Sequence, residues 1–230
     1  MNLFHRLMII TLLFITILSL YMSRRTIPYK GRGYCSIQKP YRKPTLHKQF
    51  ISNDECAYLR ECAAPLFKES KLVSGHMKNV RKSETAWLYK KDPVVAQVIS
   101  RVCALCDVPF SHAEKMQVVK YGVGDYYHEH FDASCDDREE CVEFEKNGGQ
   151  RVVTMILYLN DDFEGGHTVF PKLRQDVAPV KNNGLLFYSL EEGGAKQCHP
   201  LSLHAGKPVE KGTKYIANVW LRERPYATEQ

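Results

Sequence analysis

Residues 151–159 read RVVTMILYL, and this run of β-branched, aliphatic and aromatic residues predicts a buried β-strand. Three segments of the same character accompany it, namely QVVKY at 117–121, GLLFYSL at 184–190 and KYIANVWL at 214–221. Stretches rich in Gly, Asn and Asp separate these segments, as expected for turns between strands. The C-terminal half of the chain is therefore predicted to consist mainly of β-strands.

Two helices are predicted ahead of the strands. The first begins after Ser52, which forms a capping box with Glu55, and it ends at Pro65. The second starts at Asp92 and Pro93 and continues with apolar residues at helical spacing. Helices followed by many strands are typical of a β-sandwich or barrel with flanking helices. The predicted fold class is thus mainly β with flanking helices.

Composition and charge limit the classes of function. The chain has 230 residues, 44% hydrophobic and 25% charged, which suits one well-buried domain. The formal net charge is +6, but residues 1–48 contain 9 Lys and Arg and no acidic residue. Residues 49–230 contain 23 basic and 26 acidic residues. Because the body of the protein is slightly acidic, we expect no nucleic acid as a partner.

The N-terminus contains an apolar run at 7–22, LMIITLLFITILSLYM. It predicts an uncleaved signal anchor over residues 1–22, and a cleaved signal peptide is the alternative. Residues 23–48 combine three prolines with eight basic residues, which predicts a basic stalk and a folded domain over 49–230. The basic residues after the run favour a cytosolic body, whereas eight cysteines favour an oxidising lumen.

A possible metal site is formed by His130 and Asp132, which lie two residues apart and so leave the same face of an extended strand. His204 is the candidate third ligand, and Lys214 follows it by ten residues. One imidazole and one carboxylate on the same face, completed by a third ligand, suit a divalent ion with open coordination positions. A short His-x-Asp pair also occurs by chance, and His128 on the same face is an alternative ligand.

The agreement of further positions in one order supports the metal site. The sequence resembles the catalytic domain of the prolyl 4-hydroxylase family over nearly all of residues 49–222. The shared features are Tyr121 and Gly124, His130 and Asp132, Tyr158 to Asn160, the run Gly165-Gly-His-Thr168-Val-Phe-Pro171, Asn183 to Tyr188, His204 to Pro208, Lys214, and Trp220. One departure is His167, where the family more often has an acidic residue.

The resemblance implies a double-stranded β-helix, or jelly-roll, core and an iron-dependent chemistry. His130, Asp132 and His204 would bind Fe(II), and the distal carboxylate of 2-oxoglutarate would be held by Lys214, Thr168 and Tyr121. A buried ammonium needs such a carboxylate partner. Trp220 lies on the predicted strand face of Lys214, which would bring it close to the iron and the cosubstrate.

The expected reaction is hydroxylation of peptidyl proline to 4-hydroxyproline with O₂, and the resemblance also implies L-ascorbate as a reductant. The substrate would be a proline-rich or collagen-like peptide, preformed as polyproline II and bound by aromatic side chains. The polar segment 133–150 is predicted to be a lid over this peptide.

Two other functions stay open on the sequence. The first is a 2-oxoglutarate oxygenase that acts on a lysyl residue, a nucleobase or a small molecule, although resemblance to those groups would generally place Arg at the position of Lys214. The second is a catalytically silent, membrane-tethered peptide-binding module, which three filled ligand positions disfavour. For location we expect a single-pass type II protein with its catalytic domain in the lumen of the endoplasmic reticulum, or secretion after cleavage.

Overall fold

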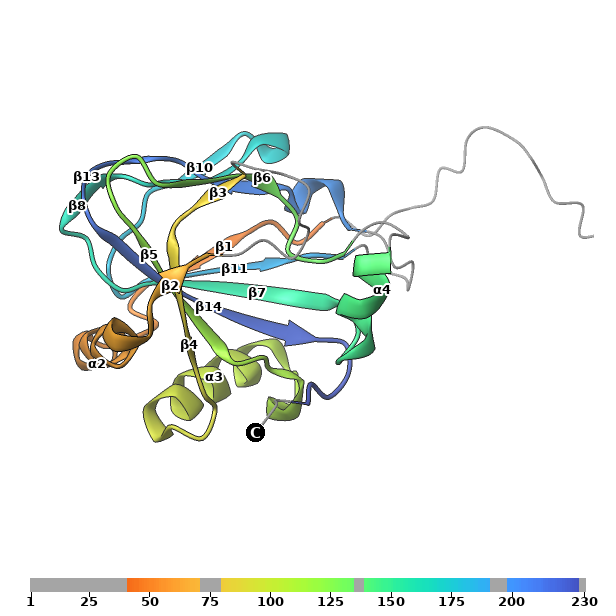
Figure 1. The fold of residues 1–230 in the computed structure, drawn as a ribbon. Helices are drawn as coiled ribbons and strands as arrows, with labels where there is room; N and C mark the ends of the chain where they lie inside the picture. The colour runs from red at the N-terminus through yellow and green to blue at the C-terminus, as the bar shows by residue number, and fades with distance from the viewer. Residues whose placement is uncertain (1–40, 71–79, 135–138, 191–197, 228–230) are drawn as a thin grey trace, which may run out of the picture. The chain divides into compact units, whose positions relative to one another are not determined.

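The computed structural model describes residues 41–70, 80–134, 139–190 and 198–227. The apolar run at 7–22 and most of the predicted stalk lie outside these residues. The described part of the chain forms two antiparallel sheets that face each other, with helices on the outside of one of them (Figure 1).

The larger sheet has seven antiparallel strands and contains all four segments predicted from the apolar pattern. In spatial order its strands are β1 (Thr45–His47), β11 (Gly184–Tyr188), β7 (Arg151–Tyr158), β14 (Lys214–Arg222), β5 (Met116–Tyr121), β4 (Glu84–Leu88) and β2 (Lys68–Glu69). The inner position of β7 in the sheet explains its mainly apolar sequence, since both of its faces are covered by other parts of the protein.

The smaller sheet has five strands and supplies the other half of the jelly-roll. Its order is β10 (Gln175–Val177), β9 (Thr168–Phe170), β12 (His204–Gly206), β6 (Tyr126–His130) and β3 (Arg81–Lys82). A separate pair joins β13 (Val209–Gly212) to β8 (Phe163–Gly165). Single 3-10 turns occur at Ala64–Leu66, Phe110–His112, Pro171–Leu173 and Pro200–Ser202.

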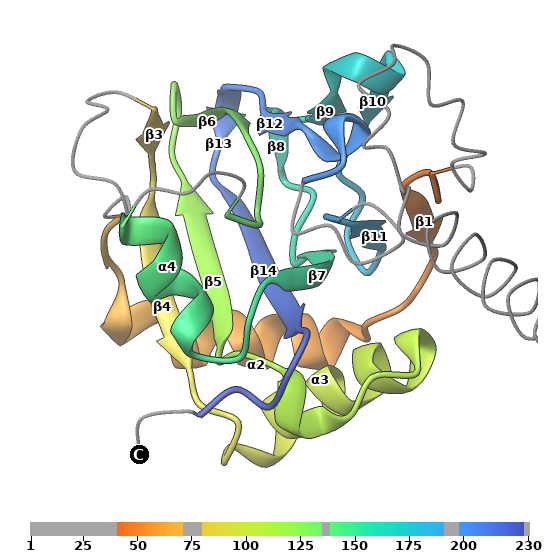
Figure 2. The same cartoon turned by 90° about the vertical axis from the view of Figure 1, so that its right-hand side faces the viewer.

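Both predicted helices are present and pack on the outer face of the seven-stranded sheet (Figure 2). α2 (Asn53–Ala63) has the predicted capping box between Ser52 and Glu55. α3 (Pro93–Cys106) begins after the Asp92 cap. Its cysteines, Cys103 and Cys106, are free, and burial raises the pKa of each thiol to about 11, as expected for core residues.

Alternate residues of the large sheet enter two different cores. On β7, Val153, Met155 and Leu157 pack with the helices, whereas Ile156 and Tyr158 point between the two sheets. The inner core is completed by aromatic and aliphatic residues of both sheets, among them Phe170, Phe187, Val209 and Ile216. The space between the sheets is therefore packed at one end, and polar residues cluster beyond it.

The folded part starts earlier than the predicted boundary at residue 49. β1 lies within the predicted stalk 23–48 and pairs with β11, Thr45 facing Leu186. Tyr41 also contacts the body, because its hydroxyl donates a hydrogen bond to the carbonyl of Tyr188 at 2.9 Å. The short polar strand carries no apolar pattern, so only its pairing with a distant segment reveals it.

The prediction of a single-pass type II membrane protein with a lumenal catalytic domain is contradicted. Within the described ranges, no helix combines the length and the apolar character needed to cross a membrane. The longest helix of those ranges, α3, has 14 residues and spans only about 21 Å at 1.5 Å per residue. The predicted anchor at 1–22 is itself outside the described residues.

A third α-helix of the described residues, α4 (Glu139–Lys146), lies in the segment 133–150 that was predicted to be a lid. The two ends of that segment are joined by Gln150, whose side chain accepts a hydrogen bond from the Ser134 amide and donates one to the Ser134 carbonyl.

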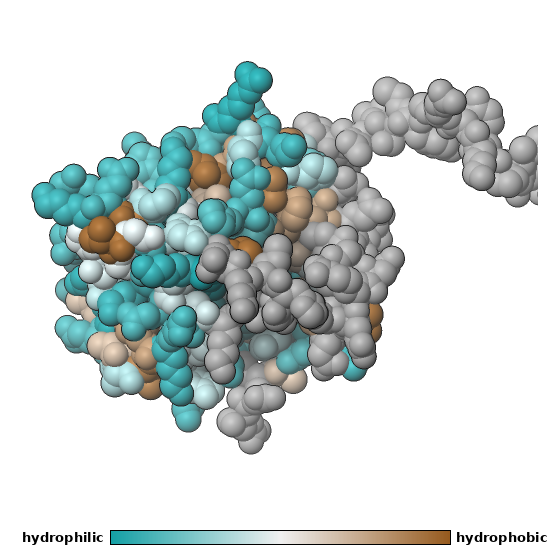
Figure 3. Space-filling model, turned by 45° about the horizontal axis from the view of Figure 1, so that its top comes forward, coloured by the Kyte–Doolittle hydropathy of each residue, from teal (hydrophilic) through white to brown (hydrophobic). Residues whose placement is uncertain are grey.

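On the face seen in Figure 3, hydrophilic residues dominate and hydrophobic residues form small separate areas.

Candidate active site

Two histidines meet where neighbouring strands of the small sheet pair. His130 is the last residue of β6 and His204 the first of β12, and the antiparallel register places them opposite each other. Their ring centroids are 4.2 Å apart. Asp132 follows two residues after His130, and one possible ligand atom from each of the three side chains lies within 4.8 Å of the others.

Backbone hydrogen bonds orient both imidazoles in the same way. Nδ1 of His130 lies 2.8 Å from the carbonyl of His128, and Nδ1 of His204 lies 3.0 Å from the carbonyl of Ser202. A carbonyl can only accept, so each Nδ1 carries the proton and donates it. The Nε2 lone pairs then point at Asp132, at 3.6 Å from Oδ1 for His130 and 3.8 Å from Oδ2 for His204.

The carboxylate of Asp132 is held on one oxygen by donors from the large sheet. Oδ2 accepts hydrogen bonds from the Thr154 hydroxyl at 2.6 Å and from the Trp220 indole nitrogen at 3.1 Å. Burial opposes ionisation, but the neighbouring side chains of His204 and His130, together with the buried Arg151, hold the pKa of Asp132 far below its usual range. Oδ1 accepts neither of these hydrogen bonds and faces His130.

A second group of polar side chains surrounds Lys214 between the sheets. Lys214 is 3% exposed, and its ammonium donates to the carbonyl of Gly166 at 2.5 Å. It lies 5.4 Å from the ring centre of Tyr121, whose Cα is its partner across β14 and β5, and 5.9 Å from that of Tyr158. The Tyr158 hydroxyl lies 3.0 Å from the Thr168 hydroxyl. Four polar groups thus lie close together among the buried residues between the two sheets.

Lys214 lacks the negative charge that a buried ammonium requires. Among the residues that the structure describes, no carboxylate forms an ion pair with it, and burial lowers its pKa to about 7. An uncompensated buried cation is costly unless a ligand neutralises it. The enclosure therefore suits one carboxylate group of a ligand.

Two histidines that could compete for a role lie elsewhere. The ring of His128 packs against Tyr126, with centroids 4.5 Å apart, and His128 is not part of the group of possible ligands found among the described residues. His167, the departure from the family pattern, pairs through Nδ1 with Asp176 at 2.6 Å on the surface.

Comparison with known proteins identifies the family of this chain. A family model described as the 2OG-Fe(II) oxygenase superfamily matches residues 116–222. A putative prolyl 4-hydroxylase of Acanthamoeba polyphaga mimivirus is 42% identical over 195 residues, which cover 85% of this chain and 80% of that protein. This chain belongs to the prolyl 4-hydroxylase family.

Other members of the prolyl 4-hydroxylase family extend the comparison. The human prolyl 4-hydroxylase subunit alpha-3 is 34% identical, but the match covers only 39% of that subunit and 89% of this chain. The crystal structure of a viral collagen prolyl hydroxylase from Paramecium Bursaria Chlorella virus-1, in complex with 2OG, superposes with a TM-score of 0.64 and 27% identity. It covers 79% of this chain and 96% of the viral chain. The predicted jelly-roll is confirmed.

Membership of the prolyl 4-hydroxylase family identifies Fe(II) and 2-oxoglutarate as the expected metal and cosubstrate, and the residues present fit both. Two imidazole nitrogens and a carboxylate oxygen converging from one side are the donor set of non-haem Fe(II) oxygenases. The ammonium of Lys214, which has no carboxylate partner in the described part of the chain, fits one carboxylate of a dicarboxylic keto acid.

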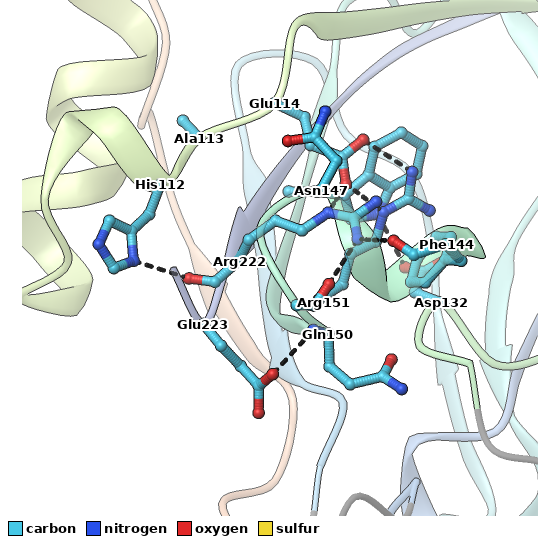
Figure 4. A network of polar contacts seen from close by, with 12 residues as sticks. His112, Ala113, Glu114, Asp132, Phe144, Asn147, Gln150, Arg151, Arg222 and Glu223 are labelled. Carbon is cyan, nitrogen blue, oxygen red and sulfur yellow. Dashed lines mark hydrogen bonds and ion pairs between the residues drawn. The ribbon is translucent and has the colours of Figure 1, made fainter. Parts of the chain in front are cut away.

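The sequence did not single out several residues that support the site. Thr154 lies within a run that reads as core, yet it faces Trp220 across β7 and β14 and binds Asp132. Arg151 stacks on Trp220, with its guanidinium carbon 3.6 Å from the ring centre, and forms two hydrogen bonds with Glu114 (Figure 4). The alternation of side chains along paired strands could have indicated that Thr154 lies on the same face as Trp220. No feature of the neighbouring sequence indicated a role for Glu114.

Proposed function

We propose that this chain hydroxylates peptidyl proline to 4-hydroxyproline, consuming O₂ and 2-oxoglutarate and releasing succinate and CO₂. One observation carries the proposal. The side chains of His130, Asp132 and His204 converge within 4.8 Å, on a fold that also buries Lys214 without a carboxylate partner among the described residues. This pairing of a three-ligand group with a buried cation is what an Fe(II) and keto-acid enzyme requires.

His130, Asp132 and His204 are assigned as the Fe(II) ligands. Bound there, Fe(II) supplies oxygen activation and the hydroxylation of an unactivated C–H bond. The protein contributes fixed ligand directions, since the two Nδ1 atoms are tied to the backbone and Asp132 is held by Thr154 and Trp220. Ligands from one side leave the remaining coordination positions for the keto acid and O₂.

Lys214, Thr168 and Tyr121 are assigned to the distal carboxylate of 2-oxoglutarate, and Trp220, further along β14, is assigned to the metal end of the site, where it donates to Asp132. The charge and burial of Lys214 support the assignment. Tyr158 joins the set, because its hydroxyl lies 3.0 Å from that of Thr168. Neutral donors beside a cation suit a carboxylate, which accepts hydrogen bonds on both oxygens.

The substrate is proposed to be an extended proline-rich or collagen-like peptide. Aromatic rings suited to proline lie close to the ligands: Tyr127 stacks on His130 with centroids 3.5 Å apart, and Trp87 lies 6.1 Å from Trp220 and is 38% exposed. A polyproline II chain loses little entropy on binding to such rings. L-Ascorbate is proposed, on family resemblance, as the reductant that restores the metal after uncoupled turnovers.

The catalytic domain is proposed to comprise residues 49–230 together with β1.

The full function is tested by incubating the protein with Fe(II), 2-oxoglutarate, ascorbate and a panel of proline-rich peptides. The expected product carries a 16 Da mass increase on proline, in equal amount to the succinate formed. Oxygen on lysine or on a small molecule would favour the other oxygenase class, and the absence of succinate with every substrate would favour a silent binding module.

The ligand assignment predicts the effect of single substitutions. His130→Ala, Asp132→Ala and His204→Ala are each expected to abolish turnover and to weaken metal binding, because each removes one of three ligands. His128→Ala is the matched control, since its backbone carbonyl, which orients His130, is retained. An inactive His128→Ala beside an active His130→Ala would show that the assigned ligand is wrong.

A further inference from the structure

A buried ion network extends from the metal-binding carboxylate to α4. Glu114, only 3% exposed, receives two hydrogen bonds from Arg151 at 2.6 and 2.8 Å and one from Arg222 at 2.7 Å. Arg151 stacks on Trp220, whose indole nitrogen donates to Asp132. Every link is a short contact between buried or half-buried groups (Figure 4).

The other end of this network holds the last turn of α4 and the residues after it. Arg222 is the final residue of β14, and its guanidinium lies 4.0 Å from the ring centre of Phe144 on α4. It also donates to the carbonyls of Phe144 at 2.8 Å and Gly149 at 2.6 Å. A guanidinium can satisfy several such carbonyls at once because its donors are fixed in a plane.

The net charge of the network is balanced by a residue of the proposed metal site. Two guanidinium groups around one carboxylate leave an excess positive charge, and Asp132 supplies the nearby negative charge that balances it. The backbone is linked as well, because the Glu114 amide donates to the carbonyl of Trp220 at 3.0 Å. A movement of Arg222 would thus alter Glu114, then Arg151 and the indole that holds Asp132.

We propose that Arg222 is a positioning residue which, through Glu114 and Arg151, couples the orientation of Asp132 to the docking of α4 on the end of β14. The inference rests on the proposed metal site. Coupling between two sites is reciprocal, so metal binding should stabilise α4 and a loosened α4 should weaken metal binding. A purely structural Arg222 would stabilise the fold equally with and without metal.

Hydrogen exchange and Mn(II) affinity test the coupling in the full chain. In the wild type, Mn(II) with 2-oxoglutarate is expected to slow amide exchange in α4. In Arg222→Lys, whose compact ammonium cannot reach Glu114 and both carbonyls together, this slowing should be lost and the Kd for Mn(II) raised about fivefold or more. Arg224→Ala is the control: Arg224 also donates to α4, at the Glu145 carbonyl, 3.2 Å away, yet no hydrogen bond or ion pair joins it to Glu114 among the described residues.

A second variant keeps the test decisive if Arg222→Lys does not fold. Phe144→Ala removes from a half-buried position the ring that lies 4.0 Å from the Arg222 guanidinium and 5.2 Å from that of Arg151, and it leaves the ion pairs of Glu114 with both arginines in place. It should weaken Mn(II) binding in the same direction, and unchanged affinity together with unchanged slowing of α4 in either folded variant would overturn the coupling. A wild type that binds no Mn(II) would instead remove the proposed metal site, and the inference with it.

Discussion

At the scale of single residues, the buried ammonium of Lys214 is expected to make the binding of 2-oxoglutarate at the proposed pocket depend on pH. Burial lowers the pKa of Lys214 to about 7, so the free pocket is largely neutral above that pH. A bound carboxylate favours the charged form, and binding above pH 7 must therefore take up a proton. The Kd for 2-oxoglutarate is expected to be nearly constant below pH 7 and to rise above it, by up to about tenfold per pH unit. Calorimetric titration with Mn(II) between pH 6 and 9 measures this.

Lys214→Arg separates the charge from its titration. A guanidinium stays charged over the whole range, so the rise in Kd above pH 7 should disappear. The planar group does not fit a pocket shaped for an ammonium, and the requirement for 2-oxoglutarate should increase sharply at every pH. If the same pH dependence persisted in Lys214→Arg, another group would be responsible for it.

Thr154 provides a second prediction at this scale. Thr154→Val keeps the shape of the side chain and removes the hydroxyl that donates to Asp132 at 2.6 Å. Loss of such a supporting hydrogen bond commonly costs about 10- to 100-fold in metal affinity or activity. We expect weaker Mn(II) binding in Thr154→Val and near-normal binding in Thr154→Ser, measured by equilibrium dialysis. Equal affinity in the two variants would show that Trp220 alone holds the carboxylate.

At the scale of elements, α2 combines a local cap with a contact that only the fold provides. The Ser52 hydroxyl accepts from the Glu55 amide at 3.1 Å, and the Glu55 carboxylate accepts from the Ser52 amide at 2.8 Å. The same carboxylate pairs with Arg101 of α3 at 2.7 Å. This pair is partly exposed, so solvent screening limits its contribution.

Ser52→Ala is expected to lower the free energy of unfolding by about 1 kcal/mol, the usual cost of a lost N-cap. Activity should not change, because α2 packs on the face of the large sheet opposite the proposed metal site. Urea denaturation and a peptide hydroxylation assay measure the two effects. Ser52→Asp, which keeps an acceptor at the cap, should retain most of the stability, and an equal loss in both variants would argue against the cap.

At the scale of the whole molecule, the site unites the two sheets. The proposed metal ligands come from the last residue of β6, the second residue after its end, and the first residue of β12 in the small sheet, whereas Lys214 and Tyr121 come from the large sheet. Metal and cosubstrate bound together should therefore hold the sheets against each other. A ligand that binds only the folded protein stabilises it by about 2.7 kcal/mol at a concentration of 100 times its Kd.

Thermal unfolding tests this consequence. Mn(II) with 2-oxoglutarate at saturating concentrations is expected to raise Tm by several degrees, since about 1 kcal/mol corresponds to about 2–4 °C for a domain of this size. In Lys214→Ala the increase with Mn(II) alone should remain, and the further increase with 2-oxoglutarate should be lost. A 2-oxoglutarate effect that persists in Lys214→Ala would place the keto acid elsewhere.

The sequence by itself determined the features that depend on neighbouring residues. The capping box at Ser52, the start of α3 at Asp92 and the four apolar strands were predicted because caps and periodicity act over a few positions. The two-residue spacing of His130 and Asp132 was also local. The family resemblance extended this to His204 and Lys214, which no local rule could have joined to them.

Only the tertiary structure decided which distant residues support the site. β1 forms because Thr45–His47 pairs with β11, nearly 140 residues further on, and its own three residues carry no strand pattern. Thr154 acts on Asp132, and Glu114 binds Arg151 and Arg222, because strand register brings them together. Hydrogen bonds and ion pairs act over a few ångströms, so their partners are determined by register and packing, which depend on the whole chain.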